Sequence, residues 1–148
     1  MTAYPGRILS IDYGTKRVGV AVSDPMRVIA QGVTTLDNDS NLLRNLSGLV
    51  AEQEASFIVV GMPYGADGGK GSKAIEVDQF IEKLAKTVDV RIETWDESYS
   101  SVNAHRAFVD IGMKRKKRQE KKRVDEMAAR LMLQEYLDHH SGKPAHGS

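Results

Sequence analysis

Three short β-rich runs open the chain, and the turns between them are too short to hold a helix, which limits the fold more than any other feature. The runs cover residues 7–12, 18–23 and 28–34, with Tyr13-Gly14-Thr15 and Asp24-Pro25 in the turns between them. Parallel neighbours need a crossover connection of roughly a dozen residues or more, usually a helix. The chain is therefore predicted to begin with a three-stranded antiparallel meander.

The next part of the chain alternates helical and strand patterns. A polar cluster at 37–40 supplies N-cap residues for a helix whose apolar face is Leu42, Leu46, Leu49 and Val50. Residues 57–60 form a continuous apolar run, typical of a strand buried on both faces, and the run Gly61-Met62-Pro63 ends it. Further elements are predicted as a helix over 77–88, a strand over 90–95, and helices over 102–111 and 124–137. This order predicts an α/β fold with a mixed five-stranded sheet flanked by helices.

Composition indicates one domain and one concentrated positive charge. The 148 residues match a single domain, assigned to 1–138, with a flexible C-terminal tail over 139–148. The chain has no cysteine, which fits a reducing compartment, and shows neither a signal peptide nor a membrane span, so a cytoplasmic location is expected. Residues 114–123 hold eight basic side chains and one acidic one, a net +7 that leaves the rest of the chain at −6 out of a total of +1. Such asymmetry predicts a polyanion as partner.

Three carboxylates fall where a site is expected. Asp12 ends the first strand, Glu97 follows the last, and Asp125 begins the last helix. In open sheets, ligands bind beyond the carboxyl ends of the parallel strands, so Asp12 and Glu97 are predicted to share one crevice, into which the last helix could bring Asp125. Three oxygen ligands suit Mg²⁺ or Mn²⁺, and such ions support in-line hydrolysis of a phosphodiester. All three are thus candidate catalytic and metal-binding residues.

Each acid also has a simpler interpretation. Asp12 could initiate the turn before Gly14, Glu97 could be a solvated loop acid or a helix cap, and Asp125 could favour the positive end of its helix dipole. These readings stay open for each acid singly. The joint placement of the three favours a functional site.

Cationic side chains supply candidate contacts to nucleic acid. Lys16 and Arg17 follow Asp12 closely and could bind phosphate, or could be a solvated turn pair. The basic run could be a solvated face, but so dense a cluster would bind phosphates with marked salt dependence. Its candidate contacts are Lys114, Arg115, Lys116, Lys117, Arg118, Lys121, Lys122 and Arg123.

Four sequence blocks resemble one known family. The segment Ile11-Asp12-Tyr13-Gly14-Thr15-Lys16-Arg17-Val18-Gly19-Val20-Ala21-Val22-Ser23-Asp24 resembles the opening motif of the YqgF (RuvX) family. The other three blocks are Val59-Val60-Gly61-Met62-Pro63 with Asp67-Gly68, Trp95-Asp96-Glu97-Ser98, and Val124-Asp125-Glu126-Met127-Ala128-Ala129 with Leu133-Gln134-Glu135-Tyr136-Leu137. The resemblance spans residues 7–138.

The resemblance implies an RNase H-like fold with strand order 3-2-1-4-5. It also implies a metal-dependent nuclease whose acids correspond to Asp12, Glu97 and Asp125. The family's expected role is maturation of the 5′ end of pre-16S rRNA during ribosome biogenesis, with rRNA precursor and ribosomal particles as partners. Its likeness to RuvC gives Holliday junction resolvase, acting on branched DNA, as the alternative. One departure is that Ser98 stands where the family commonly has arginine, which removes a candidate phosphate contact.

Two rivals come from other classes. The segment Ile11-Asp12-Tyr13-Gly14-Thr15 is also similar to the first phosphate loop of actin-like and Hsp70-like ATPases, but those enzymes need two such domains around a nucleotide. A nucleic-acid-binding or ribosome-assembly module that does not cut is the other rival, and the three retained acids argue against it. The sequence leaves the oligomeric state open.

Overall fold

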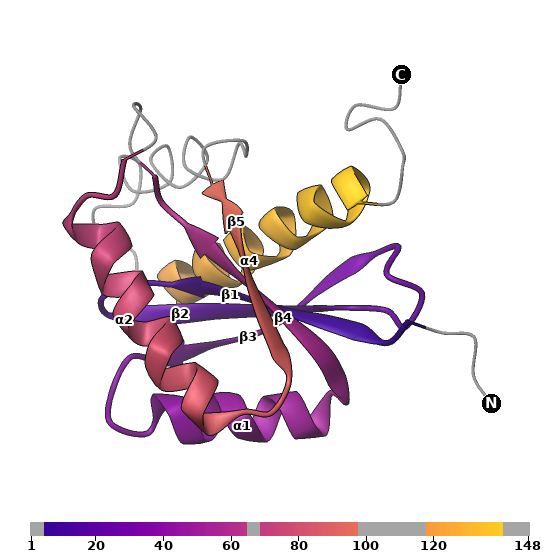
Figure 1. The fold of residues 1–148 in the computed structure, drawn as a ribbon, viewed down its shortest axis with the longest axis horizontal. Helices are drawn as coiled ribbons and strands as arrows, with labels where there is room; N and C mark the ends of the chain where they lie inside the picture. Colours follow the sequence, from indigo (N-terminus) through magenta and orange to yellow (C-terminus); the bar gives the residue numbers. More distant parts are fainter. Residues whose placement is uncertain (1–4, 65–68, 98–117, 141–148) are drawn as a thin grey trace.

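The structure is a computed structural model that describes residues 5–64, 69–97 and 118–140. Its strands are β1 (Arg7–Tyr13), β2 (Arg17–Ser23), β3 (Ala30–Asp37), β4 (Ala55–Met62) and β5 (Arg91–Asp96). Its helices are α1 (Leu42–Glu52), α2 (Ser72–Thr87) and α4 (Arg118–His140) (Figure 1). No helix in these ranges combines the length and the hydrophobicity that a membrane span needs.

The strands form one sheet in the order β3-β2-β1-β4-β5. The β1–β2 and β2–β3 pairs are antiparallel, whereas β1–β4 and β4–β5 are parallel. Short turns join the first three strands, while α1 and α2 provide the crossovers to β4 and β5. The predicted mixed sheet and its RNase H-like strand order are confirmed.

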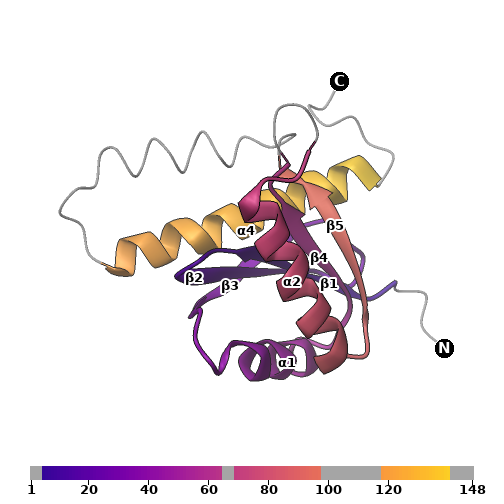
Figure 2. The same ribbon diagram turned by 60° about the vertical axis from the view of Figure 1, so that its left-hand side comes forward.

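Helices cover the two faces of the sheet unequally (Figure 2). Alternate residues of β1 point to opposite faces, so Leu9 and Ile11 pack in the cluster with α1 and α2. Ile8 belongs to the second cluster, which contains Leu133 and other residues of α4. The central strand is therefore buried on both sides, and α4 is the helix that covers one of these faces among the described residues.

Two boundaries near the hairpin and β4 differ from the sequence prediction. β3 begins at Ala30 rather than residue 28, because the Asp24 carboxylate accepts hydrogen bonds from the backbone amides of Val28 and Ile29 at 2.7 and 2.8 Å and holds them in the turn. β4 runs through Gly61 and Met62 instead of ending before them, because both pair with β5.

The start of α1 also differs from the prediction. Its N-cap is Asn41, beyond the polar cluster at 37–40, and no side-chain cap hydrogen bond forms there. Asp39 instead accepts a hydrogen bond from the Asn41 backbone amide at 2.9 Å. The cluster thus stabilises the turn before the helix.

α4 is longer at both ends than the predicted 124–137 helix. It begins at Arg118 inside the basic run, and it continues through His140, two residues into the predicted tail. The His140 ring stacks on Tyr136 with 4.0 Å between ring centroids, and Trp95 packs edge-on against both rings. These contacts explain why the last turn stays helical. The helix predicted over 102–111 and residues 141–148 lie outside the described residues.

The burial of Tyr136 also affects the ionisation of its hydroxyl group. Burial, together with the negative charge of Glu93, raises the pKa of Tyr136 to about 12. The neutral hydroxyl donates a hydrogen bond to Glu93 Oε1 at 3.3 Å. This contact joins α4 to β5 near the edge of the sheet.

Candidate active site

Asp12 lies on the face of the sheet that α4 covers. It follows Ile8 and Ser10 at alternate positions of β1, and Ser10 Oγ donates a hydrogen bond to the Ala129 carbonyl of α4 at 3.1 Å. Asp12 is only 5% exposed although it is one residue from the end of the strand. The predicted strand-end acid is therefore a buried carboxylate under α4.

Gly19 allows Asp125 to approach Asp12. Gly19 is the direct partner of Asp12 in the β1–β2 pair. A Cβ atom on Gly19 would lie 2.1 Å from the carbonyl oxygen of Asp125 and 2.6 Å from its carbonyl carbon. The backbone of α4 thus rests against the bare backbone of β2, and this contact puts Asp125 beside the neighbour of Asp12.

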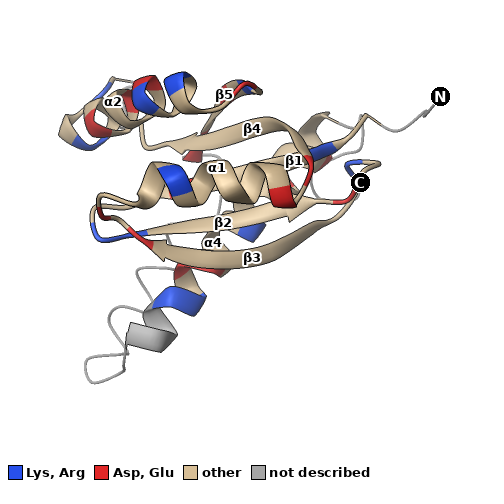
Figure 3. Ribbon diagram, turned by 90° about the horizontal axis from the view of Figure 1, so that it is seen from below, with Lys and Arg blue, Asp and Glu red and all other residues tan. Residues whose placement is uncertain are grey.

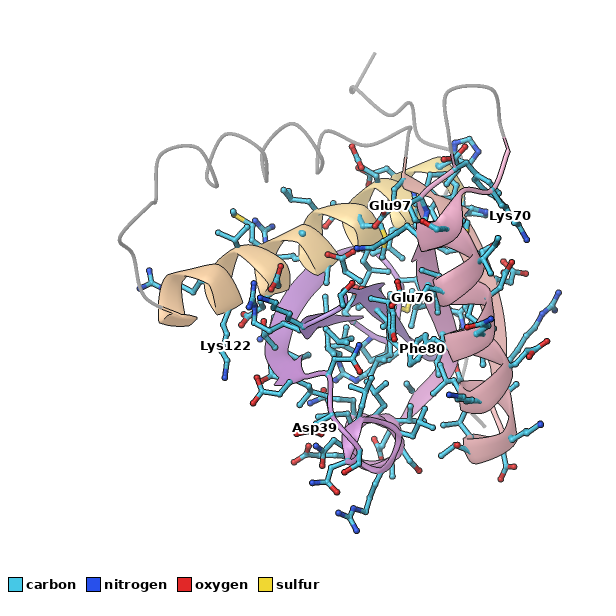
Figure 4. The ribbon with its side chains drawn as sticks, turned by 90° about the vertical axis from the view of Figure 1, so that its left-hand side faces the viewer. Asp39, Lys70, Glu76, Phe80, Glu97 and Lys122 are labelled. Atoms are coloured by element: carbon cyan, nitrogen blue, oxygen red, sulfur yellow. The ribbon has the colours of Figure 1, made fainter. Side chains whose placement is uncertain are left out.

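Gly61 likewise leaves room for a neighbouring residue, on the other side of β1. Pairing of Ile11 with Val60 makes Gly61 the next residue of β4, level with Asp12. A Cβ atom on Gly61 would lie 2.7 Å from Glu97 Oε1 and 2.5 Å from Met132 Sδ. Glu97, which is 6% exposed, therefore occupies the space over Gly61 and beside α4 (Figure 4).

The structure therefore brings the three sequence-predicted acids to one region. Asp12 is on the central strand, and Glu97 and Asp125 lie against the glycines of the two flanking strands. The sequence interpretation found the acids but missed Gly19 and Gly61. A glycine inside a β-run was the available signal, because such a glycine often marks close approach of another backbone.

Arg17 pairs with one of these acids. Its Nε atom lies 2.8 Å from Asp125 Oδ2, and the two side chains are 23% and 17% exposed. Arg17, predicted as a phosphate contact, thus balances the negative charge of Asp125, while Lys16 is exposed at the turn. A pair that is mostly shielded from water is screened less by salt than a surface pair.

A ready metal cluster is absent from the described part of the chain: no group of three His, Cys, Asp or Glu residues in it is arranged to hold an ion. The acids beside α4 nevertheless fit a hard divalent cation by chemistry, because all are oxygen donors and both Asp12 and Glu97 are buried. Ser98 lies outside the described residues.

The basic run is only partly described. Residues 114–117 lie outside the described ranges, and Arg118 and Lys121 belong to the first turns of α4. Lys122 lies 3.7 Å from Asp37, and Arg123 is exposed. Figure 3 shows basic residues where α4 starts, beyond the edge strand β3.

Comparisons with known proteins find a family match over most of the chain. Residues 6–139 match the family model of RuvX, described as Holliday junction resolvase. The chain is 40% identical over 139 residues to a protein of Ruminiclostridium cellulolyticum, covering 92% of this chain and 96% of the relative. It is 43% identical over 136 residues to one of Chlorobaculum tepidum, covering 91% and 95%. Both relatives carry the name "Putative pre-16S rRNA nuclease".

Solved structures show the same fold. RuvC of T. thermophilus in complex with a Holliday junction superposes with a TM-score of 0.58 at 11% identity, covering 93% of this chain and 96% of RuvC. The fowlpox virus Holliday junction resolvase gives a TM-score of 0.53 at 14% identity, covering 90% and 99%. At this identity the likeness is one of fold.

Proposed function

Because the chain belongs to the RuvX family, we propose that it is a nuclease that hydrolyses phosphodiester bonds in nucleic acid and matures the 5′ end of pre-16S rRNA during ribosome biogenesis. The relatives' names supply the substrate class. The proposed partners are therefore the rRNA precursor and ribosomal particles, and the proposed location is the cytoplasm.

The observation that carries the proposal is the placement of buried acids at the carboxyl ends of parallel strands. Asp12 and Glu97 are 5% and 6% exposed, and two glycines leave room for α4 to close over them. Acidic side chains are seldom this buried unless they are paired or bind a cation. A structural role alone would not require three acids around one strand end.

Asp12, Glu97 and Asp125 would hold Mg²⁺ or Mn²⁺, which activates water and stabilises the leaving oxygen of a phosphodiester. Arg17 acts on the same group of acids. Its ion pair fixes the side chain of Asp125 from the β2 side and reduces the repulsion among the carboxylates. Burial under α4 restricts access of water to Asp12 and Glu97.

The start of α4 would bind substrate phosphates. Lys122 and Arg123 end the basic run inside α4, three and two residues before Asp125. Counterions released from the nucleic acid on binding would make affinity depend strongly on salt. The cations would therefore hold the strand close to the acids.

A test compares two substrates under the same conditions. Purified protein is incubated with Mg²⁺ or Mn²⁺ and end-labelled RNA that contains the 5′ leader of 16S rRNA, beside a four-way DNA junction. Asp12→Asn is the test variant. Asp89→Asn, which changes an exposed acid between α2 and β5, is the matched control. We expect metal-dependent RNA cutting that Asp12→Asn abolishes and Asp89→Asn retains.

The other outcomes point to the alternatives. Symmetric cutting of the junction alone would assign the protein to the resolvases that the family description names. Salt-sensitive binding without cutting of either substrate would favour a module that binds nucleic acid in ribosome assembly. Equal loss of cutting in both variants would remove Asp12 from the proposed site.

A further inference from the structure

A pocket of about 390 Å³ lies on the opposite face of the sheet from the acids. Its walls are the end of β1, the turn between β3 and α1, and one side of α2. This volume falls within the range of roughly 300–1,000 Å³ that small-ligand sites occupy. Figure 4 shows Glu76 and Phe80 on the inner side of α2, toward the strands.

The pocket lies close to the acids because Tyr13, which lines it, and Asp12 are neighbours at the end of β1. Tyr13 follows Asp12 in the chain, so the two side chains point to opposite faces of one strand end. The Tyr13 ring stacks on Phe80 with 4.4 Å between ring centroids and 29° between planes. Both rings line the pocket, but Phe80 is only 5% exposed, so the partly buried Tyr13 ring provides most of the aromatic surface, one residue from Asp12.

The polar groups of the pocket come in equal number from one face of α2 and from the turn between β3 and α1. Glu76, Gln79 and Lys83 lie at spacings of three and four residues, which places them on the same side of the helix. Across from them, Asn38 Nδ2 donates to the Gly14 carbonyl at 2.8 Å, so Asn38 fixes the wall of the pocket. The side chains of Glu76 and Gln79 are thus neighbours along one helical turn.

The charges of the pocket disfavour a phosphate and favour a base. Asp39, Glu76 and Lys83 line it, so two carboxylates against one ammonium group leave a net negative charge, which disfavours a phosphate group. A carboxylate only accepts hydrogen bonds, so it requires a donor such as an exocyclic amino group. Unpaired bases are commonly recognised by an aromatic surface and by hydrogen bonds to their edges.

We propose that this pocket receives one unstacked guanine of the substrate strand, next to the bond that is cut. Guanine presents a ring N–H and an amino group side by side, which match the two oxygens of the Glu76 carboxylate. Its carbonyl oxygen would accept from the Gln79 amide. Uracil has one ring N–H but no neighbouring amino group, so it would satisfy only one oxygen of the Glu76 carboxylate. The inference rests on the proposed nuclease function and adds base preference to it.

The test measures binding without cutting. Fluorescence anisotropy in EDTA compares a short all-uridine RNA with the same RNA carrying one central guanine, and free guanosine monophosphate forms a third arm. We expect the guanine RNA to bind about tenfold more tightly than the uridine RNA, the size of effect that hydrogen bonds to a charged group give. Glu76→Gln and, separately, Gln79→Ala should reduce this preference several-fold. Glu82→Gln, an exposed acid of α2 outside the pocket, should keep it.

Each contrary result has a defined meaning. Equal affinity for the two RNAs, including no binding of either, overturns the proposal, and so does an equal effect of Glu82→Gln. If free guanosine monophosphate binds as tightly as the guanine RNA, the occupant is a free nucleotide and the strand proposal is wrong. Asp12→Asn should retain the preference while it loses cutting, so failure of the nuclease assignment and failure of the pocket are separate results.

Discussion

Replacing Gly19 with alanine tests whether the close packing of α4 on β2 positions Asp125 at the proposed site. The added Cβ would lie 2.1 Å from the Asp125 carbonyl oxygen, which is a backbone atom and not the end of a flexible side chain. Real Cβ contacts are essentially never shorter than 3.0 Å, so α4 and β2 must separate by about 0.9 Å, the difference between the two distances. The start of α4 would then move away from Asp12.

Both stability and activity should fall. Overpacking of a tight contact costs about 1–3 kcal/mol, and each kcal/mol lowers Tm by roughly 2–4 °C in a chain of this size. A shift of about 1 Å in a catalytic group lowers the rate by roughly a hundredfold. Thermal melts followed by circular dichroism, and RNA cutting at saturating metal well below the Tm, measure the two effects.

Gly48→Ala is the matched control, because the same chemical change should raise the stability of the protein instead of lowering it. Gly48 lies in α1, and nothing lies within 4 Å of the Cβ position. Alanine should stabilise the helix by about 0.4–1 kcal/mol and leave cutting unchanged. If Gly19→Ala melts and cuts like the parent protein, the close packing of α4 on β2 does not position the site and the reasoning fails.

Three further changes test other contacts. Arg17→Ala removes the ion pair with the mostly buried Asp125 and should cost about 1–3 kcal/mol in urea unfolding. Arg17→Lys should recover part of this loss, and an unchanged midpoint would show that the ion pair is not stabilising. Burial pushes the pKa of Asp24 up, but hydrogen bonds from backbone amides outweigh it and lower the pKa below 3.8. The charged form of Asp24 therefore stabilises the fold above pH 3.8. Asp24→Ala should cost about 1–2 kcal/mol of stability at pH 7 and progressively less as the pH falls below 3.8. A loss of stability that does not depend on pH would contradict this. Changing Lys122 and Arg123 together to glutamine should weaken RNA binding and flatten its dependence on salt, and unchanged salt dependence would remove the start of α4 from the substrate contact.

The sequence determined the class of the fold and the positions of the three acids. Short turns required the first strands to pair antiparallel, and the helical runs before β4 and β5 allowed parallel crossovers. Asp12 and Glu97 could be placed at strand ends because hydrophobic runs and turn residues mark where strands stop. These signals act over a few residues, so a single sequence carries them.

Tertiary structure decided which residues surround those acids. Arg17 and Asp125 are 108 residues apart in the chain, and only the packing of α4 across β2 makes them partners. The same packing requires Gly19 and Gly61, whose missing side chains leave the space that α4 and Glu97 fill. The pocket beside Tyr13 likewise forms only when α2 docks near the start of α1. Local periodicity specifies which face of an element is apolar, but it does not fix the depth or position at which two distant elements meet, because that depends on how their side chains fit together.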